Sequence, residues 1–137
     1  MIKIDNYKFY NTLINFEALA GDIVNLYGPD GSGKSTLINL LFNIFTGQEK
    51  AKGVTAKKCA FNEIMVLNGI FEFDPNKPNS TLDNLKVLIF EHSQDEYYLL
   101  WGWLNHFLKL EKRPLVIFTT NKKKFVYPKI KVLELCK

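Results

Sequence analysis

Arginine is nearly absent from this sequence, although the chain as a whole is basic. The 137 residues include 18 lysines and arginines against 14 aspartates and glutamates, which gives a formal net charge of +4, and Arg113 is the only arginine. Base readout and bidentate phosphate clamps favour arginine over lysine. The surplus charge therefore indicates a solvated lysine surface, and we expect no direct binding of nucleic acid. The one dense basic run, at 122–124, is typical of a turn.

The sequence also lacks a membrane span, a secretion signal and a cysteine-based metal site. No apolar run reaches the roughly 20 residues that a membrane helix needs, and residues 1–5 do not combine a basic start with an apolar core. Cys59 and Cys136 show no metal-type spacing. A disulfide between them has no support in the sequence, so we interpret them as thiols in a reducing compartment. We therefore expect a cytoplasmic or organellar-matrix protein, either free or peripheral to a membrane complex.

The strongest functional signal lies at residues 28–36, which match the P-loop pattern G-x-x-x-x-G-K-[ST]. Glycines tolerate positive φ and leave no Cβ in the way, so successive backbone N–H groups can turn toward one polyphosphate. A lysine at the matching position places its ammonium between the β- and γ-phosphates, and the following hydroxyl ligates Mg²⁺. The pattern predicts a nucleotide site made by nine consecutive residues: Gly28, Pro29, Asp30, Gly31, Ser32, Gly33, Lys34, Ser35 and Thr36.

The segments on either side of the loop support this interpretation. Residues 23–27 form an apolar run typical of a buried strand, and residues 36–45 carry apolar side chains at helical spacing, with Gly47 able to end the helix. Strand, loop and helix in this order are the expected context of a P-loop. The alternative is a flexible glycine- and serine-rich loop between two core elements.

The rest of the chain alternates between predicted strands and helices. A second helix is predicted at 94–112, and loops at 48–58 and 74–79; further strands are predicted at 2–5, 12–16, within 61–73, and at 86–91, 115–120 and 130–135. Such alternation predicts a parallel sheet with helices on both faces. We therefore predict one nucleotide-binding domain over residues 1–137, an α/β fold of the P-loop NTPase-like three-layer α/β/α sandwich type with a mainly parallel sheet.

Residues 21–37 closely resemble the Walker A region of ABC-type ATPases. Residues 87–92 are similar to that family's Walker B strand, 115–120 to the strand that follows it, and 130–135 to a late strand of the same core. Tyr10 falls near the position of the family's adenine-stacking aromatic residue. The resemblance therefore implies binding of ATP, or of GTP, together with Mg²⁺.

The resemblance implies roles for four residues, of which Ser35 lies in the loop and Tyr10, Glu91 and His92 lie outside it. Tyr10 would stack on the base, and Ser35 and Glu91 would hold Mg²⁺, directly or through water. The carboxylate of Glu91 ends an apolar strand, and we expect that strand end to lie beside the P-loop. His92 is the candidate catalytic base, because an imidazole with a pKa near 6.5 can accept a proton from water; alternatively it ends the strand with no catalytic role.

The sequence departs from the ABC-type pattern where hydrolysis is concerned. Glu91 replaces the expected aspartate, His92 stands at the position of the catalytic glutamate, and Thr120 at that of the switch histidine. An L-S-G-G-Q-like signature is absent from the 137 residues, and Gly53 and Lys86 are too close in sequence to enclose the helical subdomain. We therefore expect weak or partner-dependent hydrolysis, with a non-hydrolysing nucleotide-binding subunit of a larger assembly as the alternative.

Two further resemblances compete with this interpretation. Residues 71–74 and 89–92 are faintly similar to segments of small P-loop ATPases of the tRNA threonylcarbamoyladenosine pathway, although the S-P-T loop and the Tyr-Arg pair of that family are absent. Residues 30–36 resemble the loop of thymidylate kinases. Nucleotide kinases need several arginines to neutralise the transferred phosphoryl group, and one arginine does not supply them.

The predicted helix at 94–112 has an unusually broad apolar face. Its apolar side chains sweep roughly 200°, against about 100° or more for an ordinary surface helix. Either the helix is wedged between the sheet and another element of the same domain, or Trp101 or Trp103 docks on a protein partner. The partner could be a second copy of the chain or a membrane protein.

Overall fold

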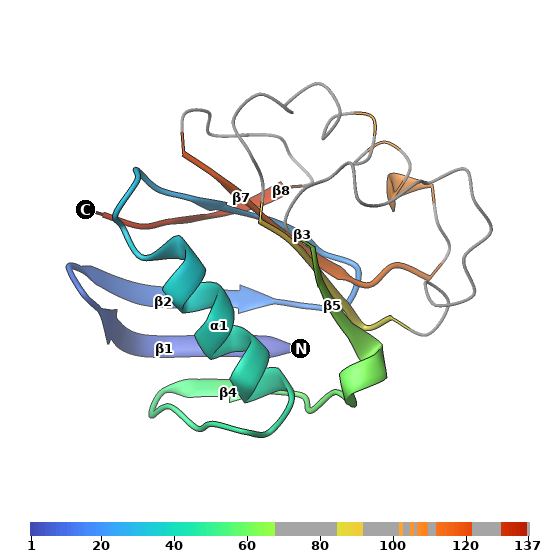
Figure 1. Ribbon diagram of the computed structural model, residues 1–137, viewed down its shortest axis with the longest axis horizontal. Helices are drawn as coiled ribbons and strands as arrows, with labels where there is room; N and C mark the ends of the chain where they lie inside the picture. The colour runs from blue at the N-terminus through green and yellow to red at the C-terminus, as the bar shows by residue number, and fades with distance from the viewer. Residues whose placement is uncertain are drawn as a thin grey trace.

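The computed structural model describes residues 1–67, 85–91, 102, 105, 107–109, 112–121 and 130–136. These residues form two β-sheets and one complete α-helix, and residues 102, 105, 107 and 108 are also helical (Figure 1). In sheet order, the parallel sheet contains β5 (Ile64–Leu67), β6 (Val87–Phe90), β7 (Leu115–Thr120), β3 (Ile23–Tyr27) and β8 (Ile130–Glu134). The antiparallel sheet contains β2 (Thr12–Ala18), β1 (Ile2–Phe9) and β4 (Val54–Ala56). The helix is α1 (Lys34–Phe45), and a 3₁₀ helix, η1, spans Phe61–Glu63.

The three central strands of the parallel sheet, β6, β7 and β3, are buried on both faces, which explains their nearly continuous apolar sequences. In β6, Val87 and Ile89 belong to the core that also contains the buried residues of α1, whereas Leu88 and Phe90 belong to a second core on the opposite face. The side chains of β7 alternate between the two cores in the same way. We call these faces the α1 face and the opposite face.

Phe107 covers part of the opposite face. It is fully buried, and its ring centroid lies 6.4 Å from that of Phe90. Residues 102, 105, 107 and 108 are helical, so helical chain lies on this face and α1 on the other. This arrangement confirms the predicted α/β class and the mainly parallel sheet. Most of the predicted helix at 94–112, including Trp101 and Trp103, lies outside the described residues.

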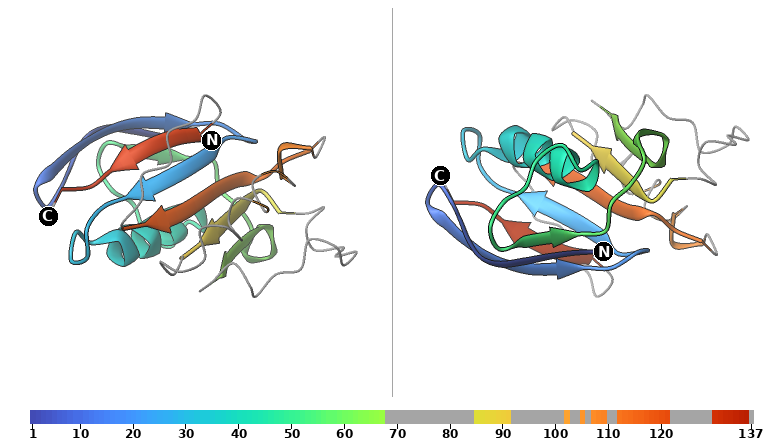
Figure 2. Two further views of the ribbon diagram at one scale, coloured as in Figure 1. Left: turned by 90° about the horizontal axis from the view of Figure 1, so that it is seen from above. Right: turned by 90° about the horizontal axis from the view of Figure 1, so that it is seen from below.

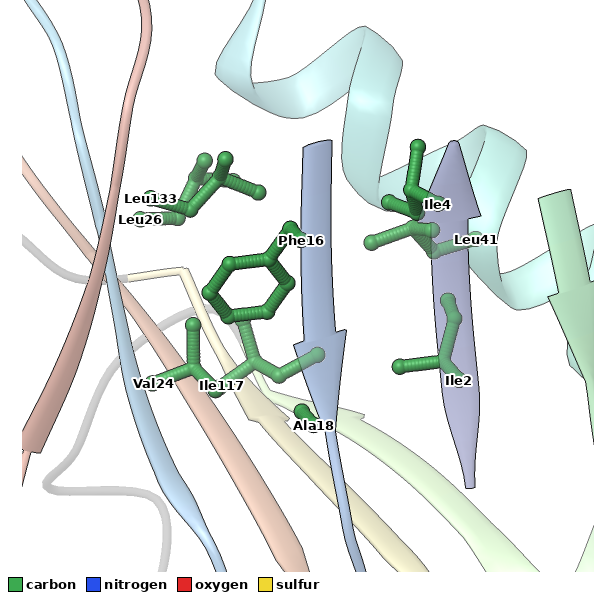
Figure 3. A pocket seen from close by; sticks show the side chains of 9 residues that line it. All are labelled: Ile2, Ile4, Phe16, Ala18, Val24, Leu26, Leu41, Ile117 and Leu133. Atoms are coloured by element: carbon green, nitrogen blue, oxygen red, sulfur yellow. The ribbon is translucent and has the colours of Figure 1, made fainter. Parts of the chain in front are cut away.

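The antiparallel sheet shares a core with α1 and the α1 face of the parallel sheet. Figure 2 shows its strands running along one margin of the parallel sheet, beside β8. Where the two sheets and α1 meet, nine apolar side chains line an enclosed cavity of ≈10 Å³ (Figure 3). Such a space holds one water at most, and its lining offers no polar partner for one. It is a packing defect rather than a ligand site.

The antiparallel sheet contains more strand than the sequence predicts. The region 48–58 was predicted as loop, but it contains β4, which pairs with β1 through Ile2, Lys3 and Ile4. Three residues are too few to show an alternating pattern, and the pairing depends on a distant partner. The first strand was predicted to end at residue 5, but β1 continues to Phe9 through an irregularity in its pairing with β2, where Asn6 has a φ of 49°.

Other predicted elements agree with the structure. The strands predicted at 23–27 and 115–120 are β3 and β7 with the same bounds, and β8 ends one residue earlier than predicted. The predicted loop at 74–79, the basic run at 122–124 and the end of the segment 61–73 lie outside the described residues. No helix in the described part of the chain has the length and apolar character needed to span a bilayer.

Candidate functional site

Residues 28–36 connect the carboxyl end of β3 to the start of α1, as the sequence predicts. Gly31 and Gly33 have φ values of 82° and 93°, in the left-handed region that other residues rarely adopt. The helix begins at Lys34, so its first N–H groups, which have no partners within the helix, point toward the loop. Together with the positive end of the helix dipole, these groups form a concave site for an anion.

The start of the loop is packed too closely for any side chain. A Cβ at Gly28 would lie 2.5 Å from the Oγ of Ser32 and 3.1 Å from the carbonyl oxygen of Leu135, the residue that follows β8. Ser32 is only 3% exposed, and its Oγ has no hydrogen-bond partner among the described residues. A buried hydroxyl without a partner, inside a loop of inward-turned amides, fits a site whose polar ligand would come from outside the chain.

Lys34 folds back over its own loop. Its Nζ donates to the carbonyl oxygens of Gly28 and Pro29, the latter at 3.1 Å. Burial lowers the pKa of Lys34, and the nearby carboxylate of Asp30 opposes this shift. The ammonium is therefore partly desolvated and held by two neutral acceptors, and a phosphate oxygen would be a stronger acceptor for it. Ser35 and Thr36 follow it, exposed, in the first turn of α1.

The loop is also attached to the carboxyl end of β7. The N–H of Gly28 donates to the carbonyl oxygen of Thr120 at 3.2 Å, and the Nδ2 of Asn25 donates to the Oγ1 of Thr120 at 2.8 Å in the interior. Beyond Thr120, the Nδ2 of Asn121 donates to the Oδ1 of Asp30 at 2.7 Å. The sequence interpretation missed Asn25 and Asn121, because only the parallel pairing of β3 with β7 brings them to the loop.

Glu91 lies one strand farther from the loop than the sequence interpretation places it. Its strand, β6, does not adjoin β3, because β7 lies between them, and the expectation that this strand end lies beside the P-loop needs this correction. The N–H of Glu91 donates to the carbonyl oxygen of Leu67 at 2.8 Å, so the ladder with β5 continues to this residue. By the alternation along β6, Glu91 then belongs to the α1 face, the face on which the loop ends.

The described residues contain no ready-made metal cluster. No group of three or more histidine, cysteine, aspartate or glutamate side chains gathers in the part of the chain that the structure describes. Glu91 and Ser35 are at most two ligands, and hard cations such as Mg²⁺ complete their shell with phosphate oxygens and water. His92, the candidate base, lies outside the described residues. The metal and catalytic assignments stay predictions.

The structure brings Tyr10 to the loop from the turn between β1 and β2. A Cβ at Gly33 would lie 3.0 Å from ring atoms of both Phe9 and Tyr10. The two rings meet edge to face with centroids 4.7 Å apart, and Tyr10 is 65% exposed. An exposed aromatic ring therefore lies beside the N-terminus of α1. Its role as a base platform stays a prediction.

Arg113 lies at the far end of the site's strands. Its Nε would be 3.7 Å from a Cβ at Gly21, just before β3, whereas the loop follows β3 at its other end. The single arginine therefore cannot reach phosphates held at residues 28–36.

Comparison with known proteins places this site in a family. The family model for ABC transporters matches residues 12–106, more than half of the chain. Over 71 residues the chain is 35% identical to the sulfate/thiosulfate import ATP-binding protein CysA of Mesostigma viride, a match that covers 52% of this chain and 20% of that protein. Over 35 residues it is 51% identical to the vitamin B12 import ATP-binding protein BtuD of Photobacterium profundum, covering 26% of this chain and 14% of that protein.

A solved structure supports the same fold. It is that of an ABC transporter assigned to the metal-chelate type, in an inward-facing conformation. The TM-score is 0.54 at 17% sequence identity, and the match covers 87% of this chain and 72% of that chain. The matched regions of the two curated relatives span at most 20% of their own length.

Proposed function

Because the chain belongs to the ABC transporter family, we propose that it binds ATP, or the closely similar GTP, together with Mg²⁺ at residues 28–36. The observation that carries this proposal is the shape of the loop. Its left-handed glycines, the free N–H groups of α1 and the desolvated Lys34 ammonium converge on one side of the strand end. These groups bind and orient a polyphosphate.

Each residue of the proposed site has a separate task. Lys34 would exchange its two carbonyl acceptors for phosphate oxygens. Ser35, exposed in the first turn of α1, and Glu91 would hold Mg²⁺. Tyr10 would stack on the base. Mg²⁺ would neutralise part of the phosphate charge in the bound complex.

Calorimetry and thermal unfolding test this proposal directly. At an ATP–Mg²⁺ concentration 100 times the Kd, the free energy of unfolding should rise by about 2.7 kcal/mol. Lys34→Ala should remove most of this gain, because it removes the only loop cation. Lys52→Ala, which truncates an exposed lysine outside the site, is the matched control and should leave binding unchanged. A wild-type chain that binds neither ATP nor GTP would refute the proposal.

We further propose that the isolated chain hydrolyses ATP weakly or only with a partner. Attack on the γ-phosphate needs a positioned base and a cationic or dipolar clamp. Thr120 is engaged with Asn25 and Gly28 at the position of the family's switch histidine, and Arg113 is at the wrong end of the sheet. Where an arginine finger is used, its absence lowers the rate by about 10³–10⁵.

The second candidate function is a nucleotide-binding subunit that does not hydrolyse ATP, favoured by the same engagement of Thr120. Single-turnover hydrolysis by the pure chain separates the two candidates. Turnover near the ordinary enzymatic range of about 1–10 s⁻¹, abolished by Lys34→Ala, would contradict both. Slow turnover abolished by the same variant supports the first candidate, and none at all supports the second.

We propose that this domain, residues 1–137, works in the cytoplasm or an organellar matrix, at the surface of a membrane protein or of a second copy of itself. Two of the matched relatives are import ATP-binding proteins by name. The predicted broad apolar helix at 94–112 would provide the docking surface. Sedimentation equilibrium with and without ATP tests whether the chain associates with a second copy of itself. The wild type is compared with Trp101→Asp, because a dimer formed through this helix should dissociate in the variant.

A further inference from the structure

Two successive residues at the end of β7 hold the P-loop at two points. The carbonyl oxygen of Thr120 accepts the N–H of Gly28 at 3.2 Å, where the loop begins. The side-chain amide of Asn121 donates to the carboxylate of Asp30 at 2.7 Å, two residues farther into the loop. Thr120 is itself fixed, because its buried Oγ1 accepts from Asn25 at 2.8 Å. Asn121 therefore projects from an anchored strand end.

Asp30 brings a charge that opposes phosphate binding. It is the only acidic residue among residues 28–36. Its carboxylate is close enough to raise the pKa of Lys34 against the effect of burial, so it is a counter-charge for the ammonium that would meet the phosphates. A carboxylate free to follow that ammonium would compete with a phosphate for it, and it would repel the phosphate as well.

We propose that Asn121 is a positioning residue for the nucleotide site and that it acts through Asp30. Its amide holds the carboxylate against the end of β7, which fixes the outer part of the loop and keeps the acid from following Lys34. The inference rests on the proposed nucleotide binding, but its structural part concerns the loop without nucleotide. A hydrogen bond to an ionised acceptor is stronger than one between neutral groups.

A double-mutant cycle tests the pairing. The cycle compares the wild type with both single variants and the double variant. Asn121→Asp places a second carboxylate opposite Asp30, and Asp30→Asn removes the first. The two changes combined exchange donor and acceptor and preserve the net charge of the pair. Two quantities are measured in each variant: ATP affinity by calorimetry with Mg²⁺, and hydrogen exchange of the backbone amides at residues 28–36 without nucleotide. Asn62→Asp, an exposed residue in η1, is the control for the change of charge.

We expect Asn121→Asp to weaken ATP binding roughly tenfold and to speed exchange in the loop. The double variant should recover both quantities to within about threefold of the wild type. A general effect on stability would not be reversed by exchanging the two residues. Additive effects, with no recovery in either quantity, would overturn the proposal.

If the proposed nucleotide binding is wrong, the same experiments give a different set of results. If neither the wild type nor the double variant binds ATP, the nucleotide proposal fails, and the exchange measurements still decide whether Asn121 positions the loop through Asp30. If the wild type binds ATP and Lys34→Ala does not, but the cycle is additive, only the positioning role of Asn121 is wrong.

Discussion

Removal of the Ser32 hydroxyl should stabilise the nucleotide-free protein. The side chain is 3% exposed, and its Oγ has no hydrogen-bond partner in the part of the chain that the structure describes. In the unfolded chain the same hydroxyl is hydrated. Folding removes that water, and no described residue replaces its hydrogen bond. Ser32→Ala deletes only the Oγ, the Ser32 atom that lies nearest to Gly28, and keeps the Cβ.

The expected gain follows from two opposing terms. A buried polar group left without a partner costs about 1–3 kcal/mol. Deleting the oxygen leaves a small void, which at ~24 cal/mol per Å³ offsets only a few tenths of a kcal/mol. The net gain should be about 1 kcal/mol, equivalent to a rise of roughly 3 °C in Tm. With a urea m-value of about 2 kcal/mol per M, the midpoint should move up by about 0.5 M.

Urea unfolding of the wild type, Ser32→Ala and Ser35→Ala measures this gain. Ser35 carries the same hydroxyl in the same motif but is exposed. Its hydroxyl stays hydrated in the folded protein, so deleting it should bring no comparable gain in stability. The higher helix propensity of alanine should raise the free energy of unfolding of Ser35→Ala by at most about 0.5 kcal/mol. If Ser32→Ala lowers the free energy of unfolding by 1 kcal/mol or more at an unchanged m-value, the hydroxyl has a partner in the folded protein, and the reasoning is refuted.

Two further predictions concern metal binding and pH. Glu91→Gln should weaken ATP binding with Mg²⁺ roughly tenfold and binding without Mg²⁺ much less; equal losses in titrations with and without the ion would remove Glu91 from the metal site. Burial alone raises the pKa of Asp22, but the N–H of Leu19 and the ammonium of Lys131, 2.9 Å away, hold it below its usual value. A lowered pKa stabilises the fold above about pH 4, and this stabilisation is lost as the pH falls further. Lys131→Met should therefore lower the free energy of unfolding by up to about 1 kcal/mol at pH 7 and by less as the pH falls below about 4. Lys3→Met, which breaks a looser and more exposed pair, should show no such dependence in unfolding curves measured over the same pH range.

Contiguous features could be predicted from the sequence, and features that depend on distant pairing could not. The strand 23–27 and the P-loop after it are local patterns, and the structure has both. The helix starts at Lys34, two residues before the apolar periodicity begins, because the left-handed Gly33 sets its start. The short strand β4 depends on a partner about fifty residues away in sequence, and no periodicity in three residues reveals such a partner.

The same distinction between contiguous and distant features applies to the residues of the candidate site. The residues proposed to hold phosphate are consecutive, so their pattern alone identifies them. The groups around them come from the ends of other strands, and the order β6–β7–β3 decides which of these groups reach the loop. Asn121 and Asp30 are 91 positions apart in sequence, and neither residue type marks the other as a partner.

The end of β7 bears most directly on turnover. A histidine at position 120 could exchange a proton near neutral pH, but a threonine hydroxyl cannot. The Oγ1 of Thr120 accepts from Asn25 in the interior, and its carbonyl oxygen accepts from Gly28, so this residue supports the loop rather than facing a reacting group. With its hydroxyl and its carbonyl oxygen engaged in this way, Thr120 is not itself a candidate base or clamp. If the proposed weak hydrolysis by the isolated chain is right, fast turnover should appear only when a partner is added.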